Sequence, residues 1–260
     1  MKVEVITPHG FCAGVERALR MAHAALAEAG GGATPALYCL HEIVHNEMVV
    51  QGLAAKGLRF VESVEEVPEG AAMLVSAHGT SPANRAVAAA RRVKVIDATC
   101  PFVAAAHAKI RENFGKGMRT VVIGAPTHAE VRGYLGEPGA CLPEEVAPGE
   151  ITGLVVQTTL DAGAHAGVCT ATRDRQQAVR DFVTAHDGGT VGVLVIGSAK
   201  SANTGRLVEV AEQSGAQAWR IASPYEIKKC AFPHLDVMGV TSGASTPEEM
   251  LRAVLLALEK

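Results

Sequence analysis

The sequence lacks several patterns that would place a protein in a large functional class. No apolar run approaches the ~20 residues that a helix needs to span a bilayer. The opening segment, MKVEVITPHG, is typical of a strand followed by a turn and not of a secretory signal peptide. The formal net charge is −3, without the basic excess that nucleic-acid binding usually requires. We therefore expect a cytoplasmic protein with no membrane span and no nucleic-acid partner.

Several short motifs of cofactor and metal chemistry are also absent. There is no CxxC pair, which argues against a simple zinc ribbon or a thioredoxin-type dithiol. GxGxxG is missing, so there is no nicotinamide or flavin fingerprint, and HAE at 128–130 lacks the spacing of HExxH. The segment GSAKSANTG lacks the spacing of a phosphate-binding P-loop despite Lys200. A redox reaction in this chain would therefore need electrons from a partner protein.

The chain does contain an alternation of short β-rich runs with helical patterns, over 260 residues that are 48% hydrophobic. Such alternation predicts an α/β fold in which parallel sheets are covered by helices. The predicted strands are residues 3–7, 36–40, 71–77, 94–98, 120–124, 153–158, 191–197, 218–222 and 236–241. The predicted helices are residues 15–28, 103–113, 175–185, 204–212 and 247–258.

A cysteine at a strand–helix junction recurs near the start, the middle and the last third of the chain. This rhythm predicts three similar α/β units, at approximately residues 10–95, 96–190 and 191–245. The N-terminal strand and the C-terminal helix are expected to pack across them, and seams are expected near 79–92 and 138–152. Because ligands bind beyond the carboxyl ends of strands in open α/β sheets, three units around a shared centre would bring those ends together.

Three of the six cysteines each end an apolar run and begin a helix-like segment. They are Cys12 in GFCAGVERAL, Cys100 in VKVIDATCPFV and Cys169 in GVCTATRDRQ. They are too far apart for a local zinc knuckle, but in a folded chain they can meet and leave one position on iron or zinc open for substrate chemistry. We interpret the other three as unligated thiols, since free cysteine is commonly a small buried hydrophobe: Cys39, Cys141 and Cys230.

Polar residues that suit a small anion follow many of the same strands. Neutral donors of this kind match a polyanion such as a diphosphate, and they are His41, His78, His128, Ser201, Asn203 and Ser245. Thr158 ends another strand, and Glu130 is a carboxyl group that can serve as a proton source if it is kept protonated. Taken singly, a histidine at a strand end is more often structural, and Ser201 is more often a helix cap.

With these residues in place, the chain resembles the 4-hydroxy-3-methylbut-2-enyl diphosphate reductase family, also called the LytB family. Nine pieces match the family's motifs in the family's order, between residues 10 and 245. They are GFCAGVERAL, HEIVHN, SAHGTSP, DATCPFV, THAEVRG, QTTL, CTATRDRQ, GSAKSANTGRL and GVTSGAS. A single match would carry little weight, but nine in order argue strongly against a chance similarity.

The resemblance implies a trefoil of three α/β units around a central 4Fe-4S cluster. The family cysteines that hold three of its irons match Cys12, Cys100 and Cys169, and the fourth iron binds the hydroxyl oxygen of the substrate. The family's diphosphate pocket corresponds to His41, His78, Ser201, Asn203 and Ser245. Its proton-delivery group corresponds to Glu130, supported by His128 and Thr158.

The implied reaction removes the allylic hydroxyl of (E)-4-hydroxy-3-methylbut-2-enyl diphosphate and gives isopentenyl and dimethylallyl diphosphates. Two electrons and two protons enter, and the hydroxyl oxygen leaves as water. Binding to iron would polarise that oxygen, and a proton from Glu130 would let it depart. The resemblance implies ferredoxin or flavodoxin as the electron donor.

The chain departs from the family around these motifs. The link between QTTL and CTATRDRQ is only DAGAHAGV, and the sequence ends at Lys260 without the family's common C-terminal tail. Lys200 and Ala202 stand where the family tends to have asparagine and serine, and Arg173 lies close to a ligand cysteine. Three alternatives therefore stay open: a related iron–sulfur reductase with another hydroxylated or allylic substrate, a non-enzymatic iron–sulfur redox sensor, and a zinc hydrolase. Three thiolates at an open site suit iron–sulfur chemistry better than hydrolytic zinc.

Overall fold

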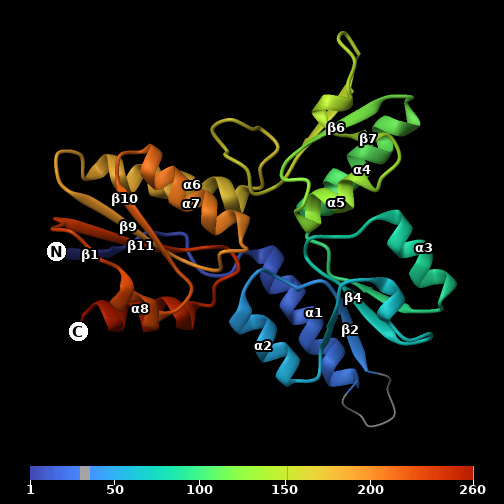
Figure 1. Ribbon diagram of the computed structural model, residues 1–260, viewed down its shortest axis with the longest axis horizontal. Coiled ribbons are helices and arrows are strands. Elements are labelled where there is room, and N and C mark those ends of the chain that lie inside the picture. Colours follow the sequence, from blue (N-terminus) through green and yellow to red (C-terminus); the bar gives the residue numbers. More distant parts are fainter. Residues whose placement is uncertain (30–35, 151, 260) are drawn as a thin grey trace. The chain divides into compact units, whose positions relative to one another are not determined.

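The computed structural model describes residues 1–29, 36–150 and 152–259 (Figure 1). The chain forms two compact units. Unit 1 comprises Met1–Cys12, His45–Glu47 and Thr159–Lys260, and unit 2 comprises Ala13–Val44 and Met48–Thr158. Among the helices of the described residues, none combines the length and the apolar character needed to cross a bilayer.

Unit 1 is built on a four-stranded parallel sheet in the order β1–β11–β9–β10. The strands are β1 (Lys2–Val5), β9 (Val191–Ile196), β10 (Gln217–Ile221) and β11 (Val237–Ser242). Every residue of the two central strands, β9 and β11, is buried. Central strands of a parallel sheet are covered on both faces, which explains why these two read as nearly continuous apolar runs.

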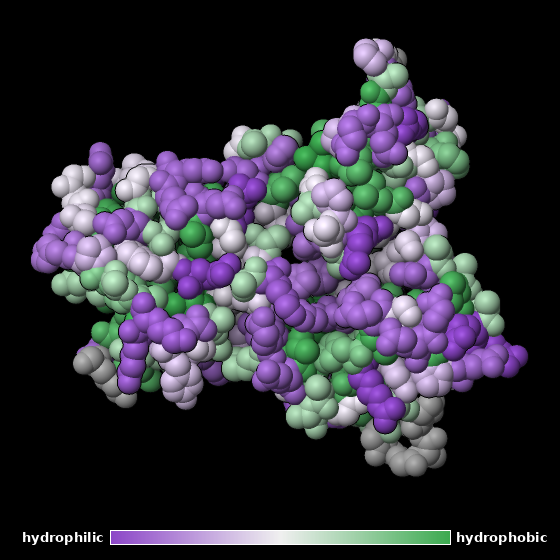
Figure 2. Space-filling view, in the orientation of Figure 1, coloured by the Kyte–Doolittle hydropathy of each residue, from purple (hydrophilic) through white to green (hydrophobic). Residues whose placement is uncertain are grey.

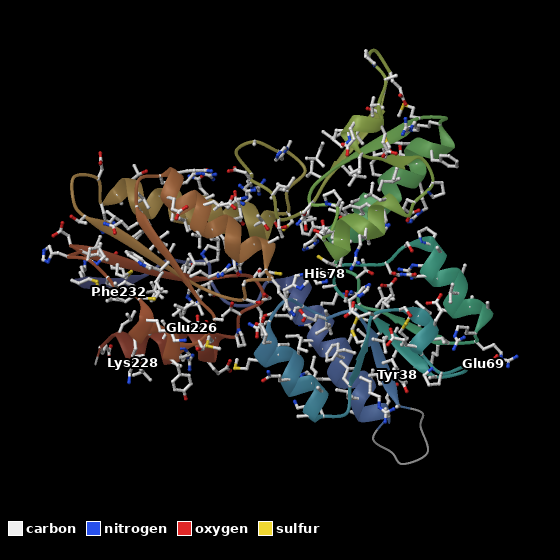
Figure 3. All side chains as sticks on the ribbon, viewed as in Figure 1. Tyr38, Glu69, His78, Glu226, Lys228 and Phe232 are labelled. Carbon is white, nitrogen blue, oxygen red and sulfur yellow. The ribbon has the colours of Figure 1, made fainter. Side chains whose placement is uncertain are left out.

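Helices cover both faces of this sheet (Figure 1). Val191, Val193 and Val195 of β9 share a core with α6 (Thr170–Ala185) and α7 (Ala202–Gln213). The alternate β9 residues, Leu194 and Ile196, share a second core with α8 (Glu248–Leu258) and with the region of the 3₁₀ helix η3 (Pro224–Lys229). In this second core Phe232, labelled in Figure 3, packs edge-to-face on Trp219 with ring centroids 5.1 Å apart. Successive side chains of β9 point to opposite faces of the sheet, so this one strand contributes to both cores.

Unit 2 contains a second four-stranded parallel sheet, in the order β3–β2–β4–β5. Its strands are β2 (Leu37–Leu40), β3 (Arg59–Val61), β4 (Ala72–Val75) and β5 (Lys94–Asp97). The surrounding helices are α1 (Ala13–Ala29), α2 (Glu47–Ala55), α3 (Pro82–Ala90) and the 3₁₀ helix η1 (Val64–Glu66). Tyr38, Leu40, Met73 and Val75 form one core with residues of η1 and α3, whereas α1 contacts β2.

Unit 2 also contains a three-stranded parallel sheet, in the order β7–β6–β8. It is formed by β6 (Arg119–Ile123), β7 (Ala140–Cys141) and β8 (Thr152–Val156), and its helices are α4 (Pro101–Gly115), α5 (Ala129–Leu135) and the 3₁₀ helix η2 (Pro143–Glu145). Val122 and Val155 share a core with α4 and α5. Leu154 points the other way and is 61% exposed, and Figure 2 shows hydrophobic atoms at the surface over this part of the chain. The described helices therefore bury mainly one face of this sheet.

All nine predicted strands and all five predicted helices form, but the sequence missed three helices and two strands. The missed elements are α2, α3, α5, β3 and β7. The segment 79–92, near which a seam was expected, contains α3. Ser81 caps that helix by accepting a hydrogen bond from the Asn84 N–H at 3.3 Å, and Pro82 occupies its first turn.

The observed sheets also divide the chain at other points than the predicted boundaries of the three α/β units. β5 spans the expected boundary at 95/96 and pairs with β4, so it belongs with the preceding strands. α6 was expected in the 96–190 unit but packs on the sheet of unit 1. β1 pairs with β11, and α8 packs on β11, so both ends of the chain belong to unit 1. The sequence pattern of a helix does not indicate on which sheet the helix will pack. The pattern therefore predicted the helices and strands but not how they are grouped into units.

Candidate functional site

The predicted site residues follow the carboxyl ends of neighbouring parallel strands in every sheet. In unit 2, His41 follows β2, His78 follows β4 and Cys100 follows β5, and these three strands are adjacent in that order. Glu130 and Thr158 follow β6 and β8, which are also adjacent. This edge is where open α/β sheets bind ligands, because the loops and helix N-termini that begin there present side chains and free N–H groups.

A carboxylate orients His41. The residue has a left-handed backbone with φ of 59°, a conformation that is uncommon for residues other than glycine. Its Nδ1 lies 3.0 Å from Oε2 of Glu62, a residue that follows the neighbouring strand β3. His41 and Glu62 line a cavity of about 230 Å³ together with Asn84 and Arg132. The Glu62 contact favours a proton on Nδ1 and so fixes the orientation of the ring.

Cys100 and His78 lie close together in unit 2. The N–H of Cys100 donates to the carbonyl oxygen of Ala77 at 3.0 Å, and Ala77 immediately precedes His78. The Oγ of Ser76 lies 3.4 Å from Nδ1 of His78. Cys100 is the N-cap residue of α4, so its sulfur lies at the end of a helix that carries partial positive charge, which favours anionic sulfur.

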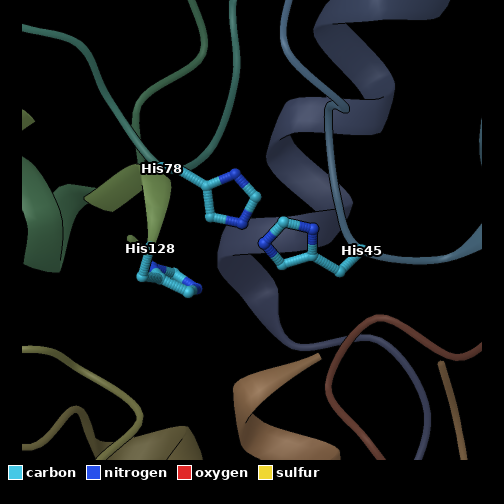
Figure 4. A group of neighbouring side chains, drawn as sticks. All are labelled: His45, His78 and His128. Carbon is cyan, nitrogen blue, oxygen red and sulfur yellow. The ribbon is translucent and has the colours of Figure 1, made fainter. Parts of the chain in front are cut away.

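His128 faces His78. Their ring centroids lie 5.5 Å apart with an interplanar angle of 89° (Figure 4). His128 is the N-cap of α5, and its Nδ1 accepts a hydrogen bond from the Glu130 N–H at 3.2 Å. A neutral ring that accepts at Nδ1 carries its proton on Nε2. The capping contact therefore favours the tautomer of His128 in which Nε2–H is a donor.

Glu130 is a buried carboxyl group with three donors around it. Its Oε1 accepts from the Thr158 N–H at 2.7 Å and from the Tyr134 hydroxyl at 3.0 Å, and its Oε2 lies 2.9 Å from the Thr158 hydroxyl. Glu130 is only 2% exposed. Burial raises the pKa of Glu130 above its ordinary value, although the hydrogen bonds from Thr158 and Tyr134 oppose the rise. Burial therefore favours the protonated form of Glu130 more than water would, while the three surrounding donors favour the ionised form.

In unit 1, two loops that precede helices bring Cys12 close to Ser245. The N–H of Cys12 donates to the carbonyl oxygen of Ala244 at 3.1 Å, and the N–H of Gly10 donates to the Ser242 hydroxyl at 2.8 Å. Gly10 has a φ of +73°, a conformation that side chains disfavour, so glycine is needed for the turn before Cys12. The hydroxyl of Ser245 donates to the carbonyl oxygen of His45 at 3.1 Å.

A chain of hydroxyl contacts connects Cys169 with Asn203 in unit 1. The Cys169 thiol donates to the Thr172 hydroxyl at 3.3 Å, and that hydroxyl donates to Oδ1 of Asn203 at 3.4 Å. Asn203 is 4% exposed, and its Nδ2 has no hydrogen-bond partner among the described residues. A buried amide donor without an acceptor is costly, so this atom is suited to an oxygen of a bound molecule.

Ser201 is a helix cap, the interpretation that its sequence context favours when it is taken alone. Its side chain accepts a hydrogen bond from the Thr204 N–H at 3.3 Å at the start of α7. The capping contact uses a lone pair of the hydroxyl oxygen and leaves its proton for another acceptor. Capping therefore does not conflict with the predicted role of Ser201 as a donor to an anion.

Sequence reasoning missed Arg175, a buried cation on α6. The residue is 4% exposed, and its guanidinium donates to the carbonyl oxygens of Gly10 at 2.8 Å and Ala171 at 3.0 Å. Burial lowers the pKa of Arg175, whereas Cys12 and Cys169 would oppose that change when their sulfurs are ionised. A signal was present, because Arg175 lies four and eight residues before Val179 and Val183 on the buried face of the helix.

Two of the residues that differ from the family motifs lie at the surface. Arg173 and Lys200 are both exposed, and Arg173 contacts the exposed Asp174. The short link is held against α6, because Gln176 accepts from the Ala162 N–H at 2.8 Å and donates to the Leu160 carbonyl oxygen at 2.8 Å.

The other three cysteines are in structural positions. Cys39 is fully buried, and burial raises the pKa of its thiol to about 12. Burial also raises the pKa values of Cys141 and Cys230, whose thiols donate to the carbonyl oxygens of Thr120 and Glu226. These thiols stay protonated at neutral pH, as unligated cysteines do. Cys12, Cys100 and Cys169 are partly exposed, as Cys230 is, but each of the three immediately precedes a helix.

Comparison with known proteins identifies the family. A family profile described as LytB protein matches residues 3–168 and 149–259. The chain belongs to the LytB family. Within that family, it is 35% identical to the 4-hydroxy-3-methylbut-2-enyl diphosphate reductase of Haemophilus influenzae strain PittEE and 36% identical to that of Actinobacillus succinogenes. Both alignments cover 100% of this chain and 90% of the relative.

Solved structures of LytB-type reductases share the fold. The E-1-hydroxy-2-methyl-but-2-enyl-4-diphosphate reductase of Plasmodium falciparum has a TM-score of 0.91 at 27% identity, covering 100% of this chain and 88% of that chain. A second structure, of the (E)-4-hydroxy-3-methyl-but-2-enyl diphosphate reductase, has a TM-score of 0.68 at 27% identity and covers 100% and 99% of the two chains. The predicted α/β fold with parallel sheets is therefore confirmed.

Proposed function

We propose that the chain is an iron–sulfur reductase of isoprenoid biosynthesis, acting on (E)-4-hydroxy-3-methylbut-2-enyl diphosphate. Its relatives carry that name and align with the whole chain. The reaction breaks the allylic C–O bond and consumes two electrons and two protons. Its products are water and either isopentenyl or dimethylallyl diphosphate. We further propose that three α/β units form a trefoil around the cofactor, as the family resemblance implies.

The cofactor of this proposal is a 4Fe-4S cluster held by Cys12, Cys100 and Cys169. Thiolates are the ligands that such clusters use, and among the cysteines of the described residues only these three directly precede helices. The buried guanidinium of Arg175, which lacks a carboxylate partner in the described part of the chain, fits an anionic centre at Cys12 and Cys169. When bound, the cluster supplies the electrons one at a time and offers an open iron position to the substrate hydroxyl.

The diphosphate is proposed to bind His41, His78, Ser201, Asn203 and Ser245. Support comes from the unpartnered Nδ2 of Asn203 and from the hydroxyl proton that Ser201 keeps while it caps α7. Neutral donors of this kind can hold a phosphate without leaving several uncompensated cations in the empty site. Hydrogen bonds to the remote diphosphate keep the allylic carbon oriented for reduction.

Proton delivery is assigned to Glu130, and the burial of this carboxyl group carries the proposal. Two of the three donors point at Oε1, so in the protonated acid the proton would be on Oε2. The Thr158 hydroxyl, which donates to Oε2 at 2.9 Å in the structure, would then rotate to accept it. Thr158 can accept that proton at its oxygen and donate its own to the departing hydroxyl. The Nε2–H of His128 is a second donor on the same helix N-terminus.

The electrons are proposed to come from ferredoxin or flavodoxin, because the sequence has no nicotinamide or flavin fingerprint. A small reduced viologen can replace the partner in a test. The anaerobically purified protein should be brown, lose colour with dithionite, and convert the hydroxymethylbutenyl diphosphate with the reduced viologen. Glu130→Gln should keep the cluster and lose turnover by ~10²-fold or more, the contribution typical of a positioned proton donor.

Each alternative would give a different result in this test. A brown protein that does not convert the diphosphate but reduces another allylic or hydroxylated compound indicates a related reductase. A brown protein without any turnover indicates a redox sensor, and a colourless zinc protein indicates the hydrolase. Full activity in Glu130→Gln would remove Glu130 from the mechanism.

A further inference from the structure

Arg175 is a buried cation whose charge is not matched by a carboxylate. In the part of the chain that the structure describes, no carboxylate lies within ion-pair distance of its guanidinium. The adjacent Asp174 is 57% exposed and contacts Arg173 instead. The Nε of Arg175 is buried and has no hydrogen-bond partner there. Burying an unpaired cation is expensive, so such a residue is expected to face an anion.

The guanidinium connects the two segments of unit 1 that carry the proposed ligand cysteines. Its Nη2 donates to the carbonyl oxygens of Gly10 at 2.8 Å and His9 at 3.4 Å, in the loop that leads to Cys12. Its Nη1 donates to the carbonyl oxygen of Ala171, two residues after Cys169, at 3.0 Å. The planar fork of arginine can hold both segments at once, which the single ammonium of lysine cannot do equally well.

Ionised sulfur at Cys12 or Cys169, like the carboxylate of Asp174, would oppose the lowering of the Arg175 pKa by burial. The cation and the two sulfurs belong to the same unit, whereas Cys100 belongs to unit 2. An anionic centre at these two sulfurs would balance the buried positive charge of Arg175. Positive charge near an iron–sulfur centre stabilises its reduced, more negative state and so raises its reduction potential.

We propose that Arg175 is a positioning residue that holds the Gly10 loop against α6 and supplies the counter-charge of the metal centre at Cys12 and Cys169. This inference rests on the proposed function, because it requires the cluster. It gives a role to a residue that lies within the matched piece CTATRDRQ but to which the sequence analysis assigned none. Its two parts, the fork of hydrogen bonds and the positive charge, predict different effects and can be separated by substitution.

The test compares the anaerobically purified wild-type protein with Arg175→Gln and Arg175→Lys. Arg175→Gln keeps a hydrogen-bond donor but loses the charge, so the midpoint potential of its cluster should fall. Arg175→Lys keeps the charge and should retain a potential near that of the wild type. Both variants lose the fork and should release iron to a chelator about tenfold faster, the lower end of the usual effect of second-sphere changes.

Arg173→Gln is the matched control, since it removes the same charge from the same helix at an exposed position. Its potential and its rate of iron release should equal those of the wild type. The inference is overturned if Arg175→Gln keeps the wild-type potential, or if Arg175→Lys shifts the potential as far as Arg175→Gln does. A wild-type chain that binds no iron would contradict the proposed function as well, whereas an intact wild-type cluster with an unaffected Arg175→Gln contradicts only the role of Arg175.

Discussion

At the scale of single residues, the most informative groups are those that the fold keeps in a costly state. Glu130 is an acid buried where its charged form is disfavoured, and Arg175 is a cation buried without a carboxylate partner among the residues that the structure describes. Interiors exclude such groups unless they are paired, so their presence indicates a function for each. The sequence marked Glu130 through a motif, but it could not show that the carboxyl group would be sealed from water.

The raised pKa of Glu130 predicts a pH-dependent stability. Above its ordinary pKa of 4.5, the unfolded chain has released this proton while the folded chain still holds it. The free energy of unfolding should therefore fall as pH rises from about 4.5 to the folded-state pKa, by ~1.4 kcal/mol per unit of pKa difference. Glu130→Gln imitates the protonated acid, since its amide can donate to the Thr158 hydroxyl, and should lack this decrease.

Urea unfolding of both proteins at several pH values measures the effect. The stability of Glu130→Gln relative to the wild type should increase with pH across this window. Glu65→Gln, at an exposed position, serves as the control and should show no such trend. A constant difference between Glu130→Gln and the wild type would mean that Glu130 is ionised in the folded protein throughout.

At the scale of helices and strands, apolar periodicity predicted the long elements and missed the short ones. β9 and β11 are central strands with continuous apolar runs, so their prediction needed no knowledge of their neighbours. α5 has only 7 residues and a histidine as its cap, so it offers fewer than two turns of apolar pattern and no preferred capping residue. α3 did have a Ser-Pro start signal, but its alanine-rich sequence gave little apolar contrast.

The candidate site also contains residues that the sequence could assign and residues that it could not. Motif matches located the cysteines and donors, because each motif sits at a strand end that the local pattern also predicts. Arg175, Tyr134 and Glu62 could not be assigned, since their roles depend on contacts across the fold. Tyr134 lies one helical turn from Glu130, but only the buried hydrogen bond gives that spacing a meaning.

The short link before Cys169 predicts a test at this scale. Gln176 on α6 is fully buried and makes one hydrogen bond to each of Leu160 and Ala162. Gln176→Ala leaves both backbone groups without their partner and should lower the free energy of unfolding by about 1–3 kcal/mol. Protease cleavage within residues 160–168 should also become faster, because the link loses its attachment to the helix.

Gln177→Ala is the matched control. Gln177 is the next residue of α6, but it is exposed and contacts only Asp181 in the described part of the chain. Its substitution should leave both the stability and the cleavage pattern unchanged within about 0.5 kcal/mol. Equal effects of the two substitutions would show that the link is held by something other than Gln176.

At the scale of the whole molecule, the predicted site residues occupy equivalent positions in all three sheets. Each sheet is parallel, and the site residues follow the carboxyl ends of its adjacent strands. The predicted ligands Cys12 and Cys169 belong to unit 1, whereas Cys100 belongs to unit 2. The other cysteines are instead inside a strand or after η3, and none of them directly precedes an α-helix of the described residues: Cys39, Cys141 and Cys230.

This division of the cysteines predicts the outcome of replacing each of the six with alanine. Loss of any proposed ligand should remove most of the iron and the visible absorption of the anaerobically purified protein, because the cluster then lacks one of three anchors. Loss of any other cysteine should leave the iron content unchanged. Among these controls, Cys39→Ala deletes only a fully buried sulfur that burial keeps protonated, with a pKa of about 12. Iron analysis of all six variants measures both halves of the prediction. Full iron in Cys100→Ala, or its loss in Cys230→Ala, would assign the wrong sulfur to the metal.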